Sequence, residues 1–426
     1  MTWPAFHAFV TDPWRRSSDL RGPHRAHRPK PAGRVLPVGA FRAIVAIIVV
    51  VSPLLAGAAP ALAGTPAPRV GEPDTARIDP ELRTLLSDVT AAGVPGILVR
   101  VQDQRGSGQA AAGVADLATG APLQPQARVR VGSITKTFVA TVVLQLVEEG
   151  RLGLDRPVGR WLPGLLRGGD TITVRQLLNH TSGLFDYTAD PALLSGIVHN
   201  RVFDPKELVA TAETHPSSFP PGTAWEYSNT NYIVAGLLVE SITRRPLGEE
   251  LQRRIFRPLG LTDTSLPTTT GNLRGYHAHG YVPADLAPTP DGRPFDVTGL
   301  NPSHAWASGA VVSSARDLAH FYRSLLGGKV LSARMLREMT TTTVETPGDP
   351  KVRYGLGIER VQDRCGANWG HSGAIFGYQS MAFWNEDTTR TVVLASTIHP
   401  APAPAGTALA TAADHALCGT PRPRNP

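Results

Sequence analysis

The chain has 426 residues, enough for one large domain or two smaller ones, and carries 42 Lys and Arg against 35 Asp and Glu. Residues 1–63 hold eight of those basic residues and two of the acidic ones, so the remainder has 34 basic and 33 acidic side chains, a net charge of +1. The high isoelectric point therefore belongs to the first 63 residues and gives no support to a nucleic-acid partner.

The N-terminal segment has the composition of a secretory signal. A stretch rich in Arg, Pro and His precedes an apolar run that begins at Ala43, and small residues end the segment at Ala63. This order predicts cleavage near Ala63 and a secreted, extracellular product. An uncleaved anchor is the alternative, and the shortness of the apolar run favours the signal peptide. Residues 64–78 are rich in Pro, Gly and Ala, and we expect a flexible linker there.

Regular patterning of apolar residues begins after this linker. Helices are expected over 79–92, 133–149, 232–243, 315–326 and 404–417, and two more begin at Thr173 and Asp204. Strands are expected over 96–101, 110–114, 378–384 and 391–397, and long loops over 262–304. The fold class that follows is α/β. It comprises a split α/β domain (79–155 and 305–420), with an antiparallel sheet flanked by N- and C-terminal helices, and a mostly helical inserted domain (156–304).

The two cysteines, Cys365 and Cys418, both follow the predicted cleavage site. An even number in an exported chain predicts one disulfide. The sequence has no motif typical of a zinc site or of a phosphate-binding loop, so we expect neither a metal nor a cofactor.

Ser133 and Lys136 stand three residues apart at the start of a long apolar run. On a helix these positions share one face, so a hydroxyl nucleophile would lie beside an amine that could take its proton. Only five of the 42 basic residues are Lys, and Arg cannot replace Lys as a base. The alternative is a helix-capping serine followed by a solvated lysine.

Two further motifs are each weak when taken alone. Tyr227-Ser228-Asn229 would project its phenol and its amide to one side of an extended segment, and cations nearby could lower the pKa of the phenol so that it relays a proton. His371-Ser372-Gly373 would lie on an edge strand whose N–H groups could bind an extended substrate. The alternatives are an aromatic residue in a loop and a histidine at the entry to a turn.

Together and in this order, the three motifs resemble the signature of the serine β-lactamase and penicillin-binding protein superfamily. The chain looks most similar to secreted actinomycete D-alanyl-D-alanine carboxypeptidases and, more distantly, to class C β-lactamases. The resemblance covers about 79–420 and implies a β-lactamase/transpeptidase-like fold. The matching blocks are Val129–Gly132, Gln176–Leu184, Tyr227–Tyr232, Leu261–Thr264, Tyr354–Gly357 and both cysteines, each followed by Gly.

The resemblance implies a role for each motif. Ser133 would be acylated, and Lys136 and Tyr227 would share the work of base and proton relay, in an order that the sequence leaves open. The side chain of Asn229 would hold the acyl amide of the substrate. The oxyanion hole would be formed by the backbone N–H groups of Ser133 and Ala374.

The third motif would contribute to substrate binding through His371, Ser372 and Gly373. His371 takes a position usually held by Lys, and Ser372 one usually held by Thr. Trp306 either lines the cleft or fills the core, and we expect the cleft. His180, beside Thr181-Ser182-Gly183, is expected to be a structural residue at a helix end.

Glu359 departs from the pattern of the carboxypeptidases, which have an arginine near this position for the terminal carboxylate of the substrate. Arg360 is adjacent, but on a strand it would point to the other face. A carboxylate facing the pocket would disfavour an anionic substrate and would favour esterase, amidase or aminopeptidase chemistry.

Three functions follow from these observations. The first is a monomeric D-alanyl-D-alanine carboxypeptidase/transpeptidase acting on peptidoglycan stem peptides, with β-lactams as inhibitors or substrates. The second is a class C-like β-lactamase, an esterase or a D-aminopeptidase acting on another small acyl substrate through the same acyl-serine. The third is a non-catalytic penicillin-binding sensor.

Overall fold

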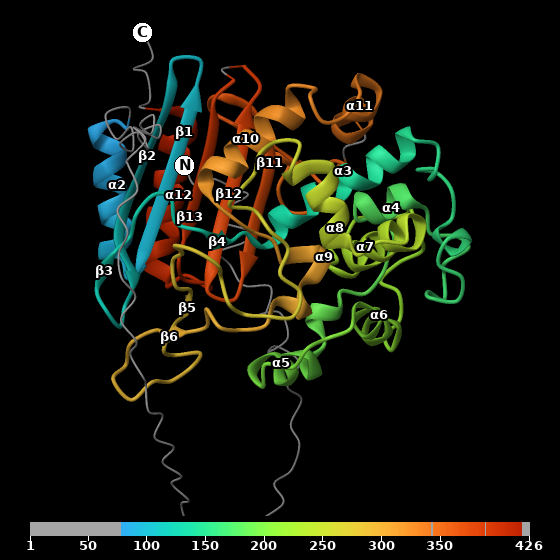
Figure 1. Cartoon of the computed structure of the whole chain (residues 1–426), viewed down its shortest axis with the longest axis horizontal. Helices are drawn as coiled ribbons and strands as arrows, with labels where there is room; N and C mark the ends of the chain where they lie inside the picture. The colour runs from blue at the N-terminus through green and yellow to red at the C-terminus, as the bar shows by residue number, and fades with distance from the viewer. Residues whose placement is uncertain (1–77, 342–343, 388, 420–426) are drawn as a thin grey trace, which may run out of the picture. The chain divides into compact units, whose positions relative to one another are not determined.

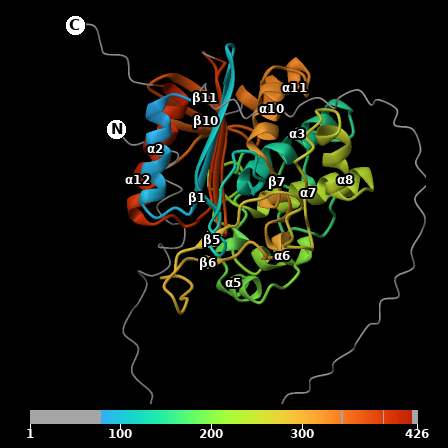
Figure 2. The ribbon, with the colours of Figure 1, turned by 60° about the vertical axis from the view of Figure 1, so that its left-hand side comes forward.

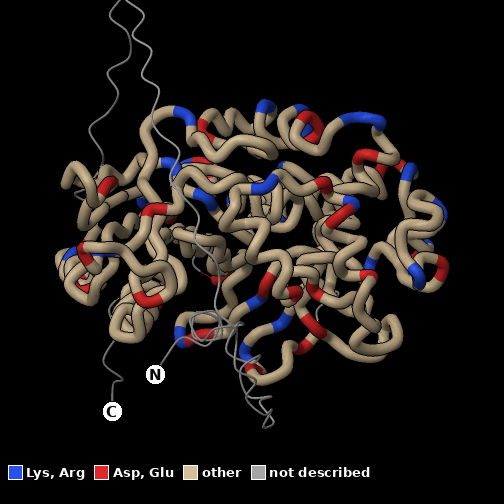
Figure 3. The backbone as a smooth tube through the Cα atoms, turned by 90° about the horizontal axis from the view of Figure 1, so that it is seen from below, with Lys and Arg blue, Asp and Glu red and all other residues tan. Residues whose placement is uncertain are grey.

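The structure is a computed structural model that describes residues 78–341, 344–387 and 389–419 (Figure 1). The predicted signal peptide, 1–63, lies outside the described residues, as does the predicted linker apart from its last residue. No helix among the described residues combines the length and the apolar character that a membrane crossing requires. Charged residues of both signs are interspersed along the described backbone (Figure 3), as the near-neutral charge after residue 63 leads one to expect.

A nine-stranded antiparallel sheet organises the described residues, in the order β3-β2-β1-β13-β12-β11-β10-β9-β8. Its strands are β1 (Gly96–Asp103), β2 (Gly106–Asp116), β3 (Ala121–Pro122), β8 (Val344–Glu345), β9 (Val352–Tyr354), β10 (Glu359–Asp363), β11 (Gly366–Ile375), β12 (Tyr378–Asn385) and β13 (Thr391–Ser396). The four predicted strands are confirmed as β1, β2, β12 and β13. Two short ribbons pair β4 (Val129–Arg130) with β7 (Val312–Ser313), and β5 (Tyr281–Val282) with β6 (Phe295–Asp296).

The centre of the sheet joins the two ends of the described chain. Strand β1 pairs with β13 from Ile97 opposite Ser396 to Gln102 opposite Thr391. All six residues of β13 are buried, because helices cover both faces of the sheet. A strand buried on both faces reads as a continuous apolar run, which is why this pair was visible in the sequence.

The helices divide between the two faces. Helices α2 (Pro80–Ala91) and α12 (Ala403–Cys418) lie side by side on one face, where Leu82, Leu86 and Val89 enter a shared core (Figure 2). On the other face, a second core runs without a break from the sheet into the helical region. The helices on that side are α3 (Thr135–Glu148), α4 (Val174–Leu178), α5 (Pro191–Val198), α6 (Pro205–Glu213), α7 (Thr230–Thr243), α8 (Leu247–Leu251), α9 (Trp306–Gly309), α10 (Ala315–Leu326) and α11 (Ala333–Thr341).

Short turns of other helix types connect these elements. The 3₁₀ turns are η3 (Gly132–Ile134), η4 (Val158–Arg160), η5 (Tyr187–Ala189) and η7 (Pro302–His304), and η6 (Gln252–Phe256) is a π-helical turn. The predicted capping box of Thr173 and Gln176 is present at the start of α4. Helices α5, α8 and α11 and strands β8 and β9 were not among the predicted elements, since they are short or irregular in pattern.

The helix predicted over 133–149 begins differently from the prediction. Ser133 lies in the 3₁₀ turn η3, and α3 follows directly from Thr135. Every residue from Thr135 to Leu144 is buried, because α3 packs among α7, α8, α9 and α11. Neither helix start has a side-chain cap, so the capping alternative for Ser133 is wrong.

Candidate active site

The Lys136 ammonium group lies beside the Ser133 hydroxyl at the buried start of α3. Its Nζ donates to Ser133 Oγ at 3.0 Å, to Asn229 Oδ1 at 2.8 Å and to the carbonyl oxygen of Ser308 at 2.7 Å. The Lys136 side chain is fully buried, whereas Ser133 keeps 6% of its surface exposed. The three acceptors fix the amine in place, and the serine stays within reach of solvent.

Burial changes the acidity of Lys136. Removal from water disfavours the charged form and lowers the pKa of Lys136 to about 7, although the negative charges of Asp186 and Glu359 act in the opposite direction. A substantial fraction of the amine is therefore neutral near pH 7. In that form it can accept the proton of Ser133 at a hydrogen-bond distance.

The Tyr227 ring lies over the same amine, with 4.9 Å between Lys136 Nζ and the ring centroid. Burial raises the pKa of Tyr227 well above its usual value, and a hydrogen bond with the Ser133 side chain only partly opposes this. The expectation that nearby cations would lower this pKa is wrong, because desolvation dominates. Tyr227 therefore stays protonated, which leaves Lys136 as the better base.

Asn229 connects Lys136 to a carboxylate that the sequence analysis missed. Its Oδ1 accepts from Lys136, and its Nδ2 donates to Asp186 Oδ2 at 3.0 Å and to Thr188 Oγ1 at 3.4 Å. Asp186 follows the matched block that ends at Leu184, and no motif marks it. Ser308 was missed too, since its backbone carbonyl makes the contact.

Two glycines bring the η3 turn against strand β11. Gly132 has a φ of 51°, and a Cβ there would come 2.6 Å from the nitrogen of Ala374. A Cβ on Gly373 would come 2.1 Å from the carbonyl oxygen of Val131 and 3.1 Å from the nitrogen of Ser133. Only glycine permits this approach, which places the backbone nitrogens of Ser133 and Ala374 in neighbouring segments.

The direction of the Ala374 N–H group follows from the pairing of β11 with its neighbouring strands. Strand β11 pairs with β12 through Ala374, but β10 pairs with β11 only as far as Gly370. The N–H of Ser372 points away from β12 toward Glu359. Because N–H groups two residues apart point the same way, that of Ala374 also points to the open side. The predicted edge strand at the third motif is therefore only partly present. The C-terminal half of β11 has one unpaired side, whereas the N-terminal half is paired with β10 and β12.

His371 differs from the expected cationic group. Its Nε2 lies 2.8 Å from the hydroxyl of Tyr354, and its Nδ1 faces both the carbonyl oxygen of Ser372 and, at 3.3 Å, Glu359 Oε1. Since the acceptors face Nδ1, that nitrogen carries the proton and Nε2 accepts from Tyr354. Burial lowers the pKa of His371 to about 3, with the charge of Lys136 acting in the same direction. The ring is fully buried and neutral, so it supplies no charge for an anionic substrate.

Glu359 holds the donor groups of the third motif. Its carboxylate accepts from Ser372 Oγ at 2.9 Å and from the Ser372 N–H at 3.2 Å. Among the described residues, the basic side chain within 4.0 Å of this carboxylate is the neutral His371. Arg360 points elsewhere, as expected, with its guanidinium 5.8 Å from the ring centroid of Trp369. Burial raises the pKa of Glu359 to about 7.

The expectation that Trp306 lines a substrate cleft is wrong. The indole is only 5% exposed, belongs to the large core and packs against Gly236 of α7, where a Cβ would come 2.8 Å from the ring. The absence of a side chain at Gly236 leaves the space that the indole fills. The short helix α9 that Trp306 begins serves the site through the carbonyl of Ser308.

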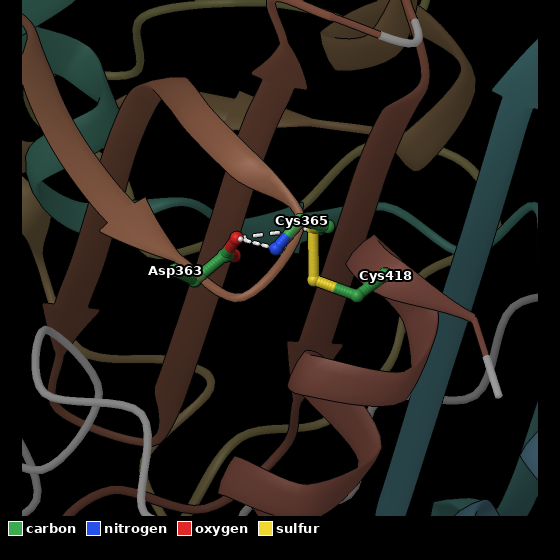
Figure 4. Close-up of side chains that lie close together, drawn as sticks. All are labelled: Asp363, Cys365 and Cys418. Carbon is green, nitrogen blue, oxygen red and sulfur yellow. Dashed lines mark hydrogen bonds between the residues drawn. A yellow bond between two sulfur atoms is a disulfide. The ribbon is translucent and has the colours of Figure 1, made fainter. Parts of the chain in front are cut away.

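The predicted disulfide joins Cys365, in the turn between β10 and β11, to Cys418 at the end of α12 (Figure 4). Asp363 accepts from the Cys365 N–H at 2.9 Å. These three residues are the one group of possible metal ligands among the described residues, and zinc would need the sulfurs as free thiolates.

Comparison with known proteins gives consistent matches. A model of the Beta-lactamase family matches residues 82–417. A D-stereospecific amidohydrolase from Streptomyces sp. is 39% identical, with a TM-score of 0.72 over 82% of this chain and 100% of that one. The D-amino acid amidase from Ochrobactrum anthropi SV3 is 29% identical, with a TM-score of 0.71 over 79% of this chain and 96% of that one.

Curated relatives include penicillin-binding proteins and an esterase. Penicillin-binding protein 4 of Amycolatopsis lactamdurans is 29% identical over 301 residues, 67% of this chain and 76% of that protein. Putative penicillin-binding protein PbpX of Bacillus subtilis (strain 168) is 28% identical, and Esterase EstB of Burkholderia gladioli is 37% identical. The chain spans 61% of the length of the former and 42% of the latter.

Proposed function

The chain belongs to the beta-lactamase family of serine acyl-transfer hydrolases, and on that premise we propose that it hydrolyses amides or esters of D-amino acids that end without a free carboxylate. Ser133 is the proposed nucleophile and Lys136 its base. The single observation that carries the choice of substrate is the pair of hydrogen bonds from Ser372 to Glu359.

The proposed reaction begins with the neutral fraction of Lys136. This amine takes the proton of Ser133 as the hydroxyl oxygen attacks the acyl carbon, and the N–H groups of Ser133 and Ala374 receive the charge that develops on the carbonyl oxygen. Tyr227 passes its proton to the leaving nitrogen or oxygen and is reprotonated by Lys136, so the proton taken from Ser133 ends on the leaving group and Lys136 is neutral again. Water then hydrolyses the acyl ester and regenerates Ser133.

The substrate class follows from charge. A substrate carboxylate at the third motif would need the donors of Ser372, which already bind Glu359, and it would meet the negative charge of the fraction of Glu359 that is ionised near pH 7. Asp186, beside Asn229, adds a second acidic group. Neutral or cationic substrates are therefore favoured over anionic ones. The amidohydrolase and the amidase that the chain is similar to support the D-configuration.

Release of ammonia from D-alaninamide, with L-alaninamide and D-alanine methyl ester alongside, tests this proposal. We expect turnover of the D-amide and the ester by the wild-type protein and none by the Ser133→Ala variant. Release of D-alanine from an acylated peptide ending in D-Ala-D-Ala should be much slower. Faster cleavage of that peptide than of any amide or ester would reject the proposal.

A D-alanyl-D-alanine carboxypeptidase/transpeptidase is the second candidate. The likeness to penicillin-binding protein 4 over two thirds of this chain supports it. A fluorescent penicillin separates the remaining alternatives. A long-lived adduct on Ser133 would indicate a peptidase and rapid turnover a β-lactamase, whereas a protein that binds penicillin but turns over no acyl substrate would be a sensor.

We also propose that the protein is exported and cleaved near Ala63. The order of basic, apolar and small residues in 1–63 supports this, as does the disulfide between Cys365 and Cys418. N-terminal sequencing of protein collected from the culture medium tests it. A mature chain that starts close to residue 64 is the expected result, and a chain retained in the cytoplasm with Met1 intact would contradict it.

A further inference from the structure

His180 occupies a backbone position that histidine rarely takes. It follows the C-terminus of α4 with a φ of 63°, in the left-handed region. Glycine is the usual residue at such a helix end, because a side chain there strains the backbone. A fully buried histidine that bears this strain must gain from contacts of its side chain.

Three hydrogen bonds of His180 reach the segment that carries the second motif and the start of α7. Its carbonyl oxygen accepts from the N–H of Glu226 at 3.1 Å. Its Nδ1 lies 3.2 Å from the N–H of Ser228 and 3.0 Å from Nδ2 of Asn231. Both neighbours are donors, so Nδ1 carries no proton and the ring is in the Nε2–H form.

The ring itself supports Tyr227. The His180 and Tyr227 rings stack with 4.3 Å between centroids and 29° between planes, and the Tyr354 ring lies edge-on to both, 4.7 Å from His180 and 6.1 Å from Tyr227. Burial, and then the charge of Lys136, hold the pKa of His180 well below its usual value, so the ring stays neutral. His180 therefore binds the backbone on both sides of Tyr227, at Glu226 through its own carbonyl oxygen and at Ser228 through the imidazole, and the imidazole also packs on the Tyr227 ring.

Tyr227 needs such support more than Lys136 does. Lys136 and Ser133 lie at the start of one buried helix, whose backbone sets their spacing. Tyr227 lies in an irregular stretch before α7, which begins at Thr230. Without a helix to hold it, the phenol depends on tertiary contacts for its place beside Ser133.

We propose that His180 is a positioning residue for the second motif. It holds the Tyr227 side chain in the position from which the phenol hydroxyl reaches Ser133. This rests on the proposed function, in which Tyr227 passes the proton to the leaving group. His180 touches no reacting atom. Its loss should lower kcat and leave KM almost unchanged, because Asn229, the proposed acyl-binding residue, keeps its own hydrogen bonds with Lys136 and Asp186.

The variant His180→Gly tests the proposal, because glycine keeps the left-handed backbone and removes only the ring. With D-alaninamide as substrate, whose leaving nitrogen must be protonated, we expect kcat to fall by about 100-fold, the loss that a displacement near 1 Å can cause. Added imidazole should restore part of the rate. Arg244→Gly is the matched control, since Arg244 is an exposed residue at the end of α7 with a φ of 59°. It should keep wild-type kcat.

A double-mutant cycle with Tyr227→Phe tests whether His180 acts through the phenol. We expect the double variant to be no slower than Tyr227→Phe alone, because the two side chains work as a unit. Multiplicative losses would overturn the proposal, as would a wild-type kcat in His180→Gly. If His180→Gly does not fold, His180→Asn replaces it, since asparagine tolerates this φ and keeps an acceptor. The His180→Asn variant should have a lower kcat and an unchanged KM. A change confined to KM would contradict the proposal.

The two proposals fail in different ways. If the wild-type protein hydrolyses neither p-nitrophenyl butyrate nor D-alaninamide, the proposed function is wrong. If the wild-type protein is active and His180→Gly retains its kcat, the function stands and the positioning role of His180 is wrong.

Discussion

On the helical side of the candidate site, the nucleophile and its base are close neighbours in the sequence, whereas on the strand side the donor groups are bound by a residue from another strand. Lys136 reaches Ser133 across a single turn at the start of α3. Ser372 instead donates to Glu359, 13 residues earlier, at the start of β10. The contact between Lys136 and Ser133 places a base beside the nucleophile. The contact between Ser372 and Glu359 occupies hydrogen-bond donors that a substrate could otherwise bind.

This difference separates chemistry from specificity. Burial lowers the pKa of Lys136 toward neutrality, and it raises that of Glu359 to about the same value. The lysine thereby gains the ability to accept a proton from Ser133. The glutamate lies over the third motif and opposes anionic substrates. Substitutions on the helical side should therefore affect the rate with every substrate, and those on the strand side the choice among substrates.

The largest effect is expected for Lys136→Arg. Arginine keeps the positive charge but cannot lose its proton at any working pH, so kcat/KM should fall by about 10³-fold with every substrate. Steady-state hydrolysis of p-nitrophenyl butyrate measures the loss. Lys206→Arg, an exposed position on α6, is the control and should be neutral. A loss smaller than tenfold in Lys136→Arg would show that Lys136 is not the base.

A smaller and selective effect is expected for Glu359→Gln. Removing the negative charge should raise kcat/KM for a peptide with a terminal carboxylate by about tenfold relative to D-alaninamide, the equivalent of one modest charge interaction. The ratio of the two rates is the measurement. Glu345→Gln, on an exposed position of β8, should leave the ratio unchanged. An equal change with both substrates would place Glu359 in the chemistry instead.

The dependence of kcat/KM on pH should test whether the neutral amine of Lys136 is the base. Because the amine acts in its neutral form and its pKa is about 7, kcat/KM should rise as the pH passes upward through about 7. The charge of Asp186 raises this pKa, so Asp186→Asn should move the rising limb to lower pH. Asp285→Asn, an exposed change, is the control. A limb that stays in place would mean that another group controls the profile.

The smallest effect on activity is expected for the double variant Cys365→Ser/Cys418→Ser. The bridge closes a separation of 53 residues, so its loss could lower the free energy of unfolding by up to about 4 kcal/mol through the entropy of the unfolded chain. Denaturant unfolding measures this loss. The kcat with D-alaninamide should remain near that of the wild type, because neither cysteine contacts the candidate site. A large fall in kcat, measured where the double variant is fully folded, would contradict this expectation.

The sequence by itself determined the superfamily, the α/β class and the pairing of the nucleophile with its base. The family match confirms the superfamily that the three motifs indicated. These features were legible because they depend on local rules: apolar periodicity for α2, α3, β1 and β13, and one helical turn for Ser133 and Lys136. The helix starts at Thr173 and Asp204 could be predicted for the same reason.

Only the tertiary structure decided how the site is tuned. The pKa shifts of Lys136, Tyr227 and His371 come from burial among residues that are distant in the sequence. Spacing therefore could not reveal that His371 is neutral, nor that Trp306 fills the core. The contacts of Asp186 with Asn229 and of Glu359 with Ser372 join separate elements. A pattern of residue types predicts which groups are present, but the environment that sets their charge exists only once the chain has folded.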